Sequence, residues 1–198
     1  MSVFVILPAA GMGTRMAPPG THPGSSPKQF LSLAGAPILL HSLRAFLAVP
    51  RISAIYVAVR EPEQHRVAEL IAEHHLSDKV TVVTGGDSRQ DSVANALAAL
   101  PSTSAEDIVL VHDAVRPLID PATIPRELIV HAQTPQGATI SLLRRAFAEA
   151  AADEFIGTDE SSLLERANIP VFVVQGTSRN FKVTQPGDLE IAEFYLAG

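Results

Sequence analysis

Short apolar runs rich in β-branched residues alternate along most of the chain with stretches of helical spacing. The runs cover residues 3–7, 55–59, 80–83, 108–111 and 171–174, and helical spacing recurs over 38–47, 64–74 and 92–100. A last helix is expected over 189–196, because Pro186 suits a helix's first turn. Strands that alternate with helices form a mainly parallel sheet covered on both faces. The sequence therefore predicts an α/β fold: one Rossmann-like, three-layer domain over residues 1–198 with a mainly parallel twisted sheet.

Composition removes several classes of function. The chain has 198 residues, of which 46% are hydrophobic, and this is enough apolar material for the core of one domain. It has no cysteine, which excludes disulfides, thiolate metal sites and a cysteine nucleophile. The net charge of -6 and the scattered Lys and Arg residues argue against a nucleic-acid partner. No membrane span or signal peptide is expected, so the predicted compartment is the cytoplasm.

Small residues follow the first predicted strand, where a ligand can approach the backbone closely. The stretch reads Pro8-Ala9-Ala10-Gly11-Met12-Gly13. Small side chains leave peptide N–H groups exposed, and such groups form a concavity that binds anions. A dinucleotide-binding fingerprint would need a third glycine where Met16 stands, and a Walker A loop would need a Gly-Lys-Ser/Thr sequence that is absent here. The stretch therefore predicts a phosphate site of another kind.

Two cations accompany this turn in the sequence. Arg15 follows the second glycine, and Lys28 follows residues 17–27, a stretch rich in proline and glycine that is interpreted as a mobile surface loop. Two glycines alone would indicate only a tight turn, with Arg15 and Lys28 as ordinary surface charges. The whole pattern of strand, double alanine, Gly-x-Gly-x-Arg-Met and Pro-Lys is more specific. It resembles the nucleotidyltransferases that couple sugar phosphates to nucleotides. The resemblance makes Arg15 and Lys28 phosphate-contacting cations, and residues 17–27 between them are then interpreted as a lid over the triphosphate.

Further motifs narrow the resemblance, and together with the first they span Val3 to Leu196. They are Gly-Gly-Asp-Ser-Arg-Gln-Asp-Ser-Val from Gly85, His-Asp-Ala-Val-Arg-Pro from His112, Thr-Pro-Gln from Thr134, Thr-Asp-Glu from Thr158 and Asn-Phe-Lys-Val-Thr from Asn180. In this order they resemble the family of 2-C-methyl-D-erythritol 4-phosphate cytidylyltransferases. The resemblance implies transfer of a cytidylyl group from CTP to that acceptor in non-mevalonate isoprenoid precursor synthesis. A ribitol 5-phosphate enzyme, or a CTP-binding module without activity, stays open as an alternative.

The resemblance also implies a role for each matching residue. The attacking phosphate oxygen is already anionic and needs no general base, so catalysis rests on charge and position. The implied catalytic residues are Arg15 and Lys28, and the implied Mg²⁺ ligand is Asp113, which follows a strand at the sheet's ligand-binding edge. The implied nucleotide-binding residues are Pro8, Ala9, Ala10, Gly11, Gly13, Gly86, Asp87 and Ser92. The phosphate of the acceptor is assigned to Arg126, Thr134 and Lys182.

Several of these residues also have simpler interpretations. Asp87 and Ser92 can turn the chain before the helix expected over 92–100, and Asp91 is a good candidate to cap it. Arg126 and Lys182 alone would be solvated surface charges. Seven histidines raise the question of a metal centre, but the adjacent His74 and His75 cannot share a helix face. These two are expected at the surface, and His112 is expected to be a packing residue.

One part of the family pattern is missing. Only 16 residues, 118–133, separate Pro117 from Thr134, where the family has a further strand, a projecting dimerisation arm and an Asp-Thr-x-Lys motif. Both flanks match the family, so the joint lies near Ile124 and Pro125. Either the chain has lost this segment or the printed sequence omits it. Omission is favoured, because loss of a central strand would expose backbone groups and apolar surface. A homodimer is expected if the arm is present.

Overall fold

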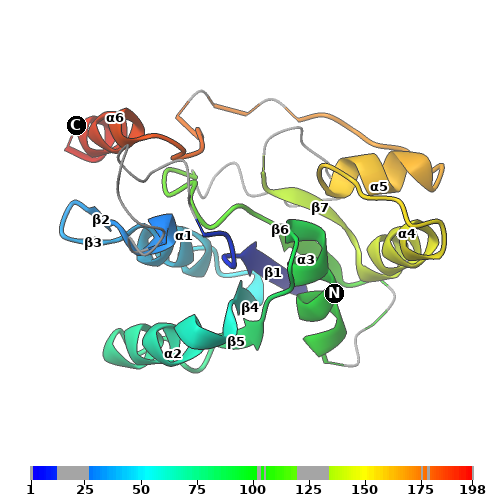
Figure 1. The fold of residues 1–198 in the computed structure, drawn as a ribbon, viewed down its shortest axis with the longest axis horizontal. Helices are drawn as coiled ribbons and strands as arrows, with labels where there is room; N and C mark the ends of the chain where they lie inside the picture. Colours follow the sequence, from blue (N-terminus) through cyan, green and yellow to red (C-terminus); the bar gives the residue numbers. More distant parts are fainter. Residues whose placement is uncertain are drawn as a thin grey trace.

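A central sheet organises the molecule (Figure 1). The computed structural model describes residues 2–12, 27–101, 104, 106–119, 134–174, 176–177 and 179–197. Among these residues the main sheet has five strands in the order β5-β4-β1-β6-β7. Their bounds are β1 (Val3–Pro8), β4 (Ile52–Val59), β5 (Val80–Thr84), β6 (Ile108–Val111) and β7 (Gln136–Thr139).

Four of these strands are parallel, and β7 is antiparallel to β6. A separate small hairpin joins β2 (Ser32–Leu33) to β3 (Ala36–Pro37). Its turn places Ala34 at φ 47° and Gly35 at φ 81°, which is the left-handed region that favours glycine. The hairpin leads directly into the first helix.

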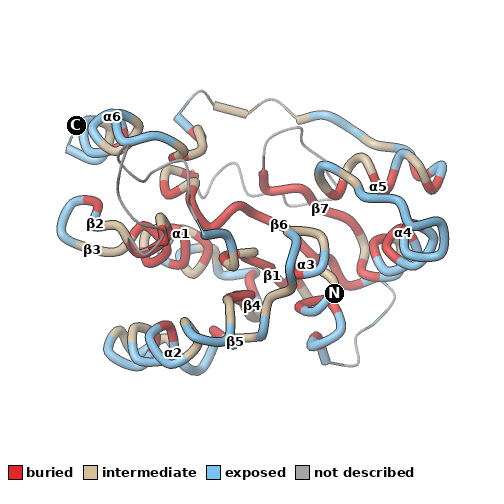
Figure 2. Tube along the Cα trace, viewed as in Figure 1, coloured by how far each residue is buried: buried red, intermediate tan, exposed pale blue. Residues whose placement is uncertain are grey.

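Helices cover both faces of the sheet because side chains alternate along each strand. Val5 and Leu7 point to the face covered by α1 (Ile38–Leu47) and α2 (Gln64–Glu73). Phe4 and Ile6 point to the opposite face. That face is covered by α3 (Arg89–Ala99), α4 (Ile140–Ala152) and α5 (Glu160–Arg166). Figure 2 shows the buried residues concentrated between these layers. The predicted three-layer α/β fold is confirmed.

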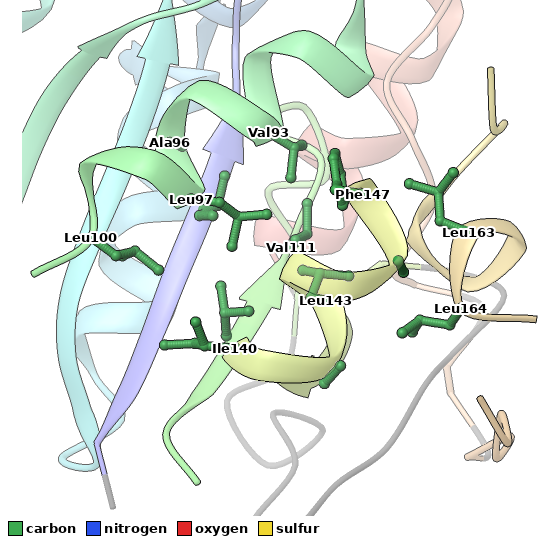
Figure 3. Close-up of a cluster of buried hydrophobic side chains, with 14 of the residues drawn as sticks. Val93, Ala96, Leu97, Leu100, Val111, Ile140, Leu143, Phe147, Leu163 and Leu164 are labelled. Atoms are coloured by element: carbon green, nitrogen blue, oxygen red, sulfur yellow. The ribbon is translucent and has the colours of Figure 1, made fainter. Parts of the chain in front are cut away.

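Figure 3 shows the cluster of buried apolar side chains on the second face, where α3, α4 and α5 pack against the sheet. Val93 and Leu97 of α3 lie beside Leu143 and Phe147 of α4, and Leu163 of α5 closes the cluster. All five side chains are at most 9% exposed. Burial on this scale contributes roughly 1.5–3 kcal/mol per large apolar side chain. The packing therefore fixes the start of α3 and of α5, where Arg89 and Glu160 lie.

The order of the strands creates a switch point in the sheet. The chain runs outward from β1 through β4 to β5, and then α3 carries it back to β6 on the other side of β1. The chain therefore leaves the carboxyl ends of the neighbouring strands β1 and β6 toward opposite edges of the sheet. In open α/β sheets ligands bind in the crevice that opens at such a point.

The C-terminal helix α6 (Pro186–Ala197) begins at Pro186, so the predicted role of this proline in a helix's first turn is confirmed. Its Ala192 belongs to a small third cluster with Leu33, Ile38, Val115 and Val183. Two short 3-10 turns, η2 (Lys28–Phe30) and η3 (Glu61–Glu63), complete the regular elements of the described ranges. No helix in those ranges is long and apolar enough to cross a membrane.

Four of the five predicted strands are confirmed, and the fifth is wrong. Residues 171–174 form no strand, and the side chains of Phe172 and Val173 are 66% and 78% exposed. Apolar composition gives a run strand propensity, but a strand also needs a neighbour with which to pair. In contrast, β7 was not predicted, because its sequence Gln-Gly-Ala-Thr has no apolar periodicity. The joint near Ile124 and Pro125 lies outside the described residues.

Candidate active site

A cavity of about 280 Å³ opens at the carboxyl ends of β1 and β6, where the sheet has its switch point. It brings together most of the sequence-predicted site residues, from five separate segments of the chain. Those that line it are Pro8, Ala9, Ala10, Gly11, Lys28, Gly86, Asp87, Ser92, Asp113 and Lys182. Gly13, Arg15 and Arg126 lie outside the described residues, as does all of the predicted lid except Pro27.

The loop after β1 is held open by hydrogen bonds from its flanks. The backbone N–H of Ala9 donates to the carbonyl of Ala58 at 2.7 Å. Its carbonyl accepts from the side-chain amide of Gln29 at 2.6 Å, and Gln29 is buried. Gln29 belongs to η2, so this bond also fixes Lys28 at the rim of the cavity. Sequence reasoning did not single out Gln29, although it stands beside the Pro-Lys pair.

The loop after β5 folds back over the start of α3. Gly85 donates from its N–H to the carbonyl of Val59 at 2.7 Å, and Gly86 donates from its N–H to the hydroxyl of Ser92 at 3.0 Å. The Ser92 hydroxyl donates in turn to the carbonyl of Ser88 at 2.9 Å. A β-carbon on Gly86 would collide with Asp91, so only glycine fits there. Ser92 is therefore buried as part of the wall that presents Gly86 and Asp87.

The start of α3 differs from the sequence prediction. The helix begins at Arg89 rather than at residue 92, and Ser88 is its N-cap. Ser88 accepts from the N–H of Asp91 at 3.0 Å, and Asp91 accepts from the N–H of Ser88 at 3.1 Å. Asp91 thus takes part in capping, but from the third helical position of a reciprocal capping box. The earlier start matters because it places Arg89 in the first turn, facing Asp113.

Asp113 is surrounded by three basic side chains. Its Oδ2 is 2.8 Å from Nζ of Lys182 and 3.3 Å from Nε of Arg116, and its Oδ1 is 3.2 Å from Nε of Arg89. Burial alone would raise the pKa of Asp113, but the charges of Lys182 and Arg89 outweigh it and hold this pKa well below its usual range. Asp113 is therefore an ionised carboxylate at the floor of the cavity.

Arg89 connects Asp113 to a second carboxylate that the sequence prediction left without a role. Its Nη1 and Nη2 donate to the two oxygens of Glu160 at 2.6 and 3.0 Å. Glu160 is the first residue of α5 and is only 2% exposed. Burial would lower the pKa of Arg89, but Glu160 and Asp113 raise it above its ordinary value. Both Arg89 and Glu160 belong to motifs visible in the sequence, but their pairing depends on how α5 packs.

Thr134 and Asn180 support Asp113 from behind. The hydroxyl of Thr134 accepts from the backbone N–H of Asp113 at 3.1 Å. The carbonyl of Thr134 accepts from the side-chain amide of Asn180 at 2.6 Å. Arg116 donates to the carbonyl of Asn180 at 2.8 Å, and Val183 follows in the same segment. Thr134 is thus buried in the wall, whereas Lys182 from that segment reaches the cavity.

His112 is buried beside this centre and packs as predicted. Its ring lies edge-on to Phe46, with 4.9 Å between ring centroids, and its Nε2 is 3.1 Å from the carbonyl oxygen of Arg116. Burial lowers the pKa of His112 to about 4. His74 is half-buried and His75 is exposed. Within the described residues no group of three or more His, Asp or Glu side chains can hold a metal ion.

Comparison with known proteins gives a consistent result. The family model for 2-C-methyl-D-erythritol 4-phosphate cytidylyltransferase (IspD) matches residues 3–129 and 121–198. The enzyme of that name from Acidobacterium capsulatum is 54% identical over 235 residues, covering 99% of this chain and 98% of its own length. The Solibacter usitatus protein of the same name is 44% identical, with 99% and 96% covered.

Solved structures agree with these sequences. The crystal structure of the Francisella tularensis 2-C-methyl-D-erythritol 4-phosphate cytidylyltransferase superposes with a TM-score of 0.78 at 27% identity, covering 98% of this chain and 99% of that one. The protein from Thermus thermophilus superposes with a TM-score of 0.72 at 26% identity, and both chains are covered completely. With family match, identity and fold in agreement, this chain belongs to the 2-C-methyl-D-erythritol 4-phosphate cytidylyltransferase family.

Proposed function

We propose that this chain transfers a cytidylyl group from CTP to 2-C-methyl-D-erythritol 4-phosphate. The products are 4-diphosphocytidyl-2-C-methyl-D-erythritol and pyrophosphate, and the reaction belongs to non-mevalonate isoprenoid precursor synthesis. The observation that carries the proposal is the cavity at the switch point. There, the loop after β1, Lys28, Lys182 and the ionised Asp113 line one space. Family membership supplies the identity of the nucleotide and the acceptor.

The chemistry asks for positioning rather than proton transfer. An oxygen of the acceptor phosphate attacks the α-phosphorus of CTP, a new P–O bond forms, and the bond to the β-phosphate oxygen breaks. The attacking oxygen is already anionic, and pyrophosphate leaves as an anion, so no proton has to move. Negative charge crowds at the α-phosphorus in the transition state. Groups that place positive charge or N–H dipoles there accelerate the reaction.

The two sides of the cavity suit the two substrates. We assign the triphosphate to the loop from Pro8 to Gly11, with Lys28 and Arg15 as the cations that stabilise the transition state. Gly86, Asp87 and Ser92 are assigned to the cytosine and ribose, because carbonyl or carboxylate oxygens there can accept from the exocyclic amine of cytosine. Asp87 supports this assignment by its exposed position on the cavity wall.

The acceptor phosphate is assigned to Lys182, Arg126 and Thr134. Lys182 supports this assignment, since its ammonium lies in the cavity next to Asp113 and its side chain is 35% exposed. The hydroxyl of Thr134 is engaged with the backbone of Asp113, so its contribution would be made from the wall. Arg126 completes the set by its place in the sequence pattern.

We further propose that the triphosphate brings Mg²⁺ to Asp113. The residues present fit such an ion: Asp113 is an ionised carboxylate in the cavity, and Mg²⁺ in nucleotide sites is commonly held by one or two carboxylates, water and phosphate oxygens. When bound, the ion would neutralise phosphate charge. The three basic groups on Asp113 balance its charge before the nucleotide arrives.

Pyrophosphate release with purified chain, CTP and each acceptor tests the function. Release with 2-C-methyl-D-erythritol 4-phosphate and none with ribitol 5-phosphate is the expected result. Release with ribitol 5-phosphate alone would reassign the acceptor. CTP binding without release from either acceptor would leave a nucleotide-binding module. An Arg15→Ala variant, folded but inactive, would connect the release to the phosphate turn.

We also propose that a segment between Ile124 and Pro125 exists in the protein and is omitted from the printed sequence. Three observations support this. The family model matches in two parts that overlap over 121–129. The alignment with the Acidobacterium relative extends over 235 positions against 198 residues in this chain, leaving at least 37 positions without a counterpart. The exposed apolar side chains of Phe172 and Val173 fit a missing neighbour strand.

Intact-mass measurement decides this point, because a mass well above 21.0 kDa supports omission and 21.0 kDa rejects it. If the segment carries the family's dimerisation arm, the protein is expected to be a homodimer. Sedimentation of the same preparation tests that expectation, since a monomer of the higher mass would contradict it.

A further inference from the structure

Glu160 is connected to Asp113, the proposed metal ligand, through Arg89. The two Nη atoms of Arg89 hold the Glu160 carboxylate, and its Nε donates to Oδ1 of Asp113 at 3.2 Å. Glu160 itself lines no part of the 280 Å³ cavity. We propose that Glu160 is a positioning residue that fixes Arg89, so that Arg89 orients the proposed metal ligand Asp113 with one N–H at Oδ1 and does not compete for Oδ2. The inference rests on the proposed function and deepens it.

The position of Glu160 is itself tightly determined. Asp159 caps α5 and accepts from the N–H of Ser162 at 2.9 Å. The side-chain Nε2 of Gln136 in β7 donates to Oδ2 of Asp159 at 3.0 Å, and its Oε1 accepts from the backbone N–H of Ser161 at 3.0 Å. These bonds attach the first turn of α5 to the sheet. Glu160 is therefore presented to Arg89 from a rigid element.

The planar guanidinium of Arg89 explains why its pairing with Glu160 matters for Asp113. A guanidinium pairs with a carboxylate best through two parallel N–H bonds. If Glu160 did not occupy both Nη atoms, Arg89 would be free to form such a pair with Asp113 and would compete with Lys182 and Arg116 for Oδ2. With Glu160 in place, only Nε faces Asp113. Oδ2 of Asp113 is then left to Lys182 and Arg116, and Asp113 lines the cavity.

A purely structural role predicts different behaviour. If the buried ion pair between α3 and α5 only held the two helices together, its loss would lower stability and would weaken CTP binding equally with and without metal. A positioning role predicts a selective loss of metal-dependent binding, because partners outside the first coordination shell commonly change metal affinity or activity by about 10–100-fold. The metal dependence of CTP binding therefore separates the two roles.

The test is calorimetric titration of the full chain with CTP, once with Mg²⁺ and once in EDTA. For Glu160→Gln we expect CTP binding with Mg²⁺ to weaken by about tenfold or more, and binding in EDTA to stay within about twofold. Arg89→Lys should behave in the same way, because an ammonium lacks the planar fork that pairs with both oxygens of Glu160 while Nε faces Asp113. The matched control is Glu149→Gln, which alters a surface pair with Arg145 on α4 and should change neither titration.

A double variant tests the inference in a protein that is expected to fold, and a double-mutant cycle tests whether Glu160 acts through Asp113. Arg89→Gln with Glu160→Gln removes both buried charges at once, which proteins tolerate better than loss of one partner, and should show the same selective loss. In an Asp113→Asn background, Glu160→Gln should have no further effect on CTP binding with Mg²⁺. Equal loss in both titrations, or none in either, would overturn the inference. Failure of the native chain to release pyrophosphate would instead contradict the proposed function.

Discussion

The hydroxyl oxygen of Thr134 accepts a hydrogen bond from the backbone N–H of Asp113 at 3.1 Å, across 21 positions of sequence. Both residues are buried, so this bond satisfies a donor that water does not reach. It also fixes the backbone of Asp113, and with it the position of the carboxylate in the cavity. The relationship gives Thr134 a structural function that is separate from its proposed contact with the acceptor phosphate.

Replacing Thr134 by valine should destabilise the fold by about 1–3 kcal/mol, because it leaves the buried N–H of Asp113 unpaired. Thr134→Ser keeps the acceptor oxygen and should retain most of that stability. Urea unfolding followed by circular dichroism measures both variants. Equal unfolding free energies for the valine and serine variants would show that this hydrogen bond contributes nothing.

Lys28→Ala should lower kcat by about 10²–10³-fold, the usual cost of removing one group that stabilises charge in a transition state. The side chain lies at the rim of the cavity, so thermal stability should change little. Lys79→Ala is the matched control, since Lys79 contacts the carbonyl of Ile52 at the opposite end of β4. A Lys28→Ala variant with native kcat would remove Lys28 from the catalytic residues.

The sequence predicted those parts of the molecule whose signals are local. Burial on two faces makes a parallel strand a continuous apolar run, which is why 3–7 and 108–111 were identified correctly. Asp113 could be placed at the cavity because it follows such a run, and because ligands bind at the carboxyl ends of strands. Gly86 could be assigned from the resemblance of its motif.

The remainder depends on contacts between distant residues. Arg89 and Glu160 are 71 positions apart, and no periodicity connects them. Their pairing follows from the packing of α5 on β7, a strand that itself has no apolar pattern. Residues 171–174 show the reverse case, in which local propensity for a strand is strong but no partner pairs with it in the described ranges.

Gly86→Ala should weaken CTP binding by roughly tenfold or more while the chain stays folded. A β-carbon at this position meets the backbone and β-carbon of Asp91, so the loop must move away from α3 and from its bond to Ser92. A displacement of about 1 Å at a binding wall is enough to cost two orders of magnitude in rate. Gly187→Ala in α6 has open space around it and should bind CTP as the native chain does. Comparable affinities for the two variants would mean that the loop tolerates the shift.

His112 should make the fold sensitive to acid over a defined range. Its pKa is lowered to about 4 by burial, against 6.5 in the unfolded chain, so above pH 6.5 the ring is neutral in both states. Between pH 6.5 and about 4 the unfolded chain binds a proton that the folded chain does not, and stability falls as the pH is lowered. The accumulated loss is about 3 kcal/mol, since each pKa unit corresponds to about 1.4 kcal/mol.

His112→Asn removes this titration, so its unfolding free energy should approach that of the native chain as the pH falls from 7.5 to 4.5. The variant starts less stable because Asn leaves a gap beside Phe46. The difference in unfolding free energy between the variant and the native chain removes the contribution of the carboxylates, which titrate in both. His75→Asn, which changes an exposed ring, should give a constant difference across the same range. If the His112→Asn difference is equally constant, His112 binds its proton at the same pH in the folded and the unfolded chain, and the lowered pKa is wrong.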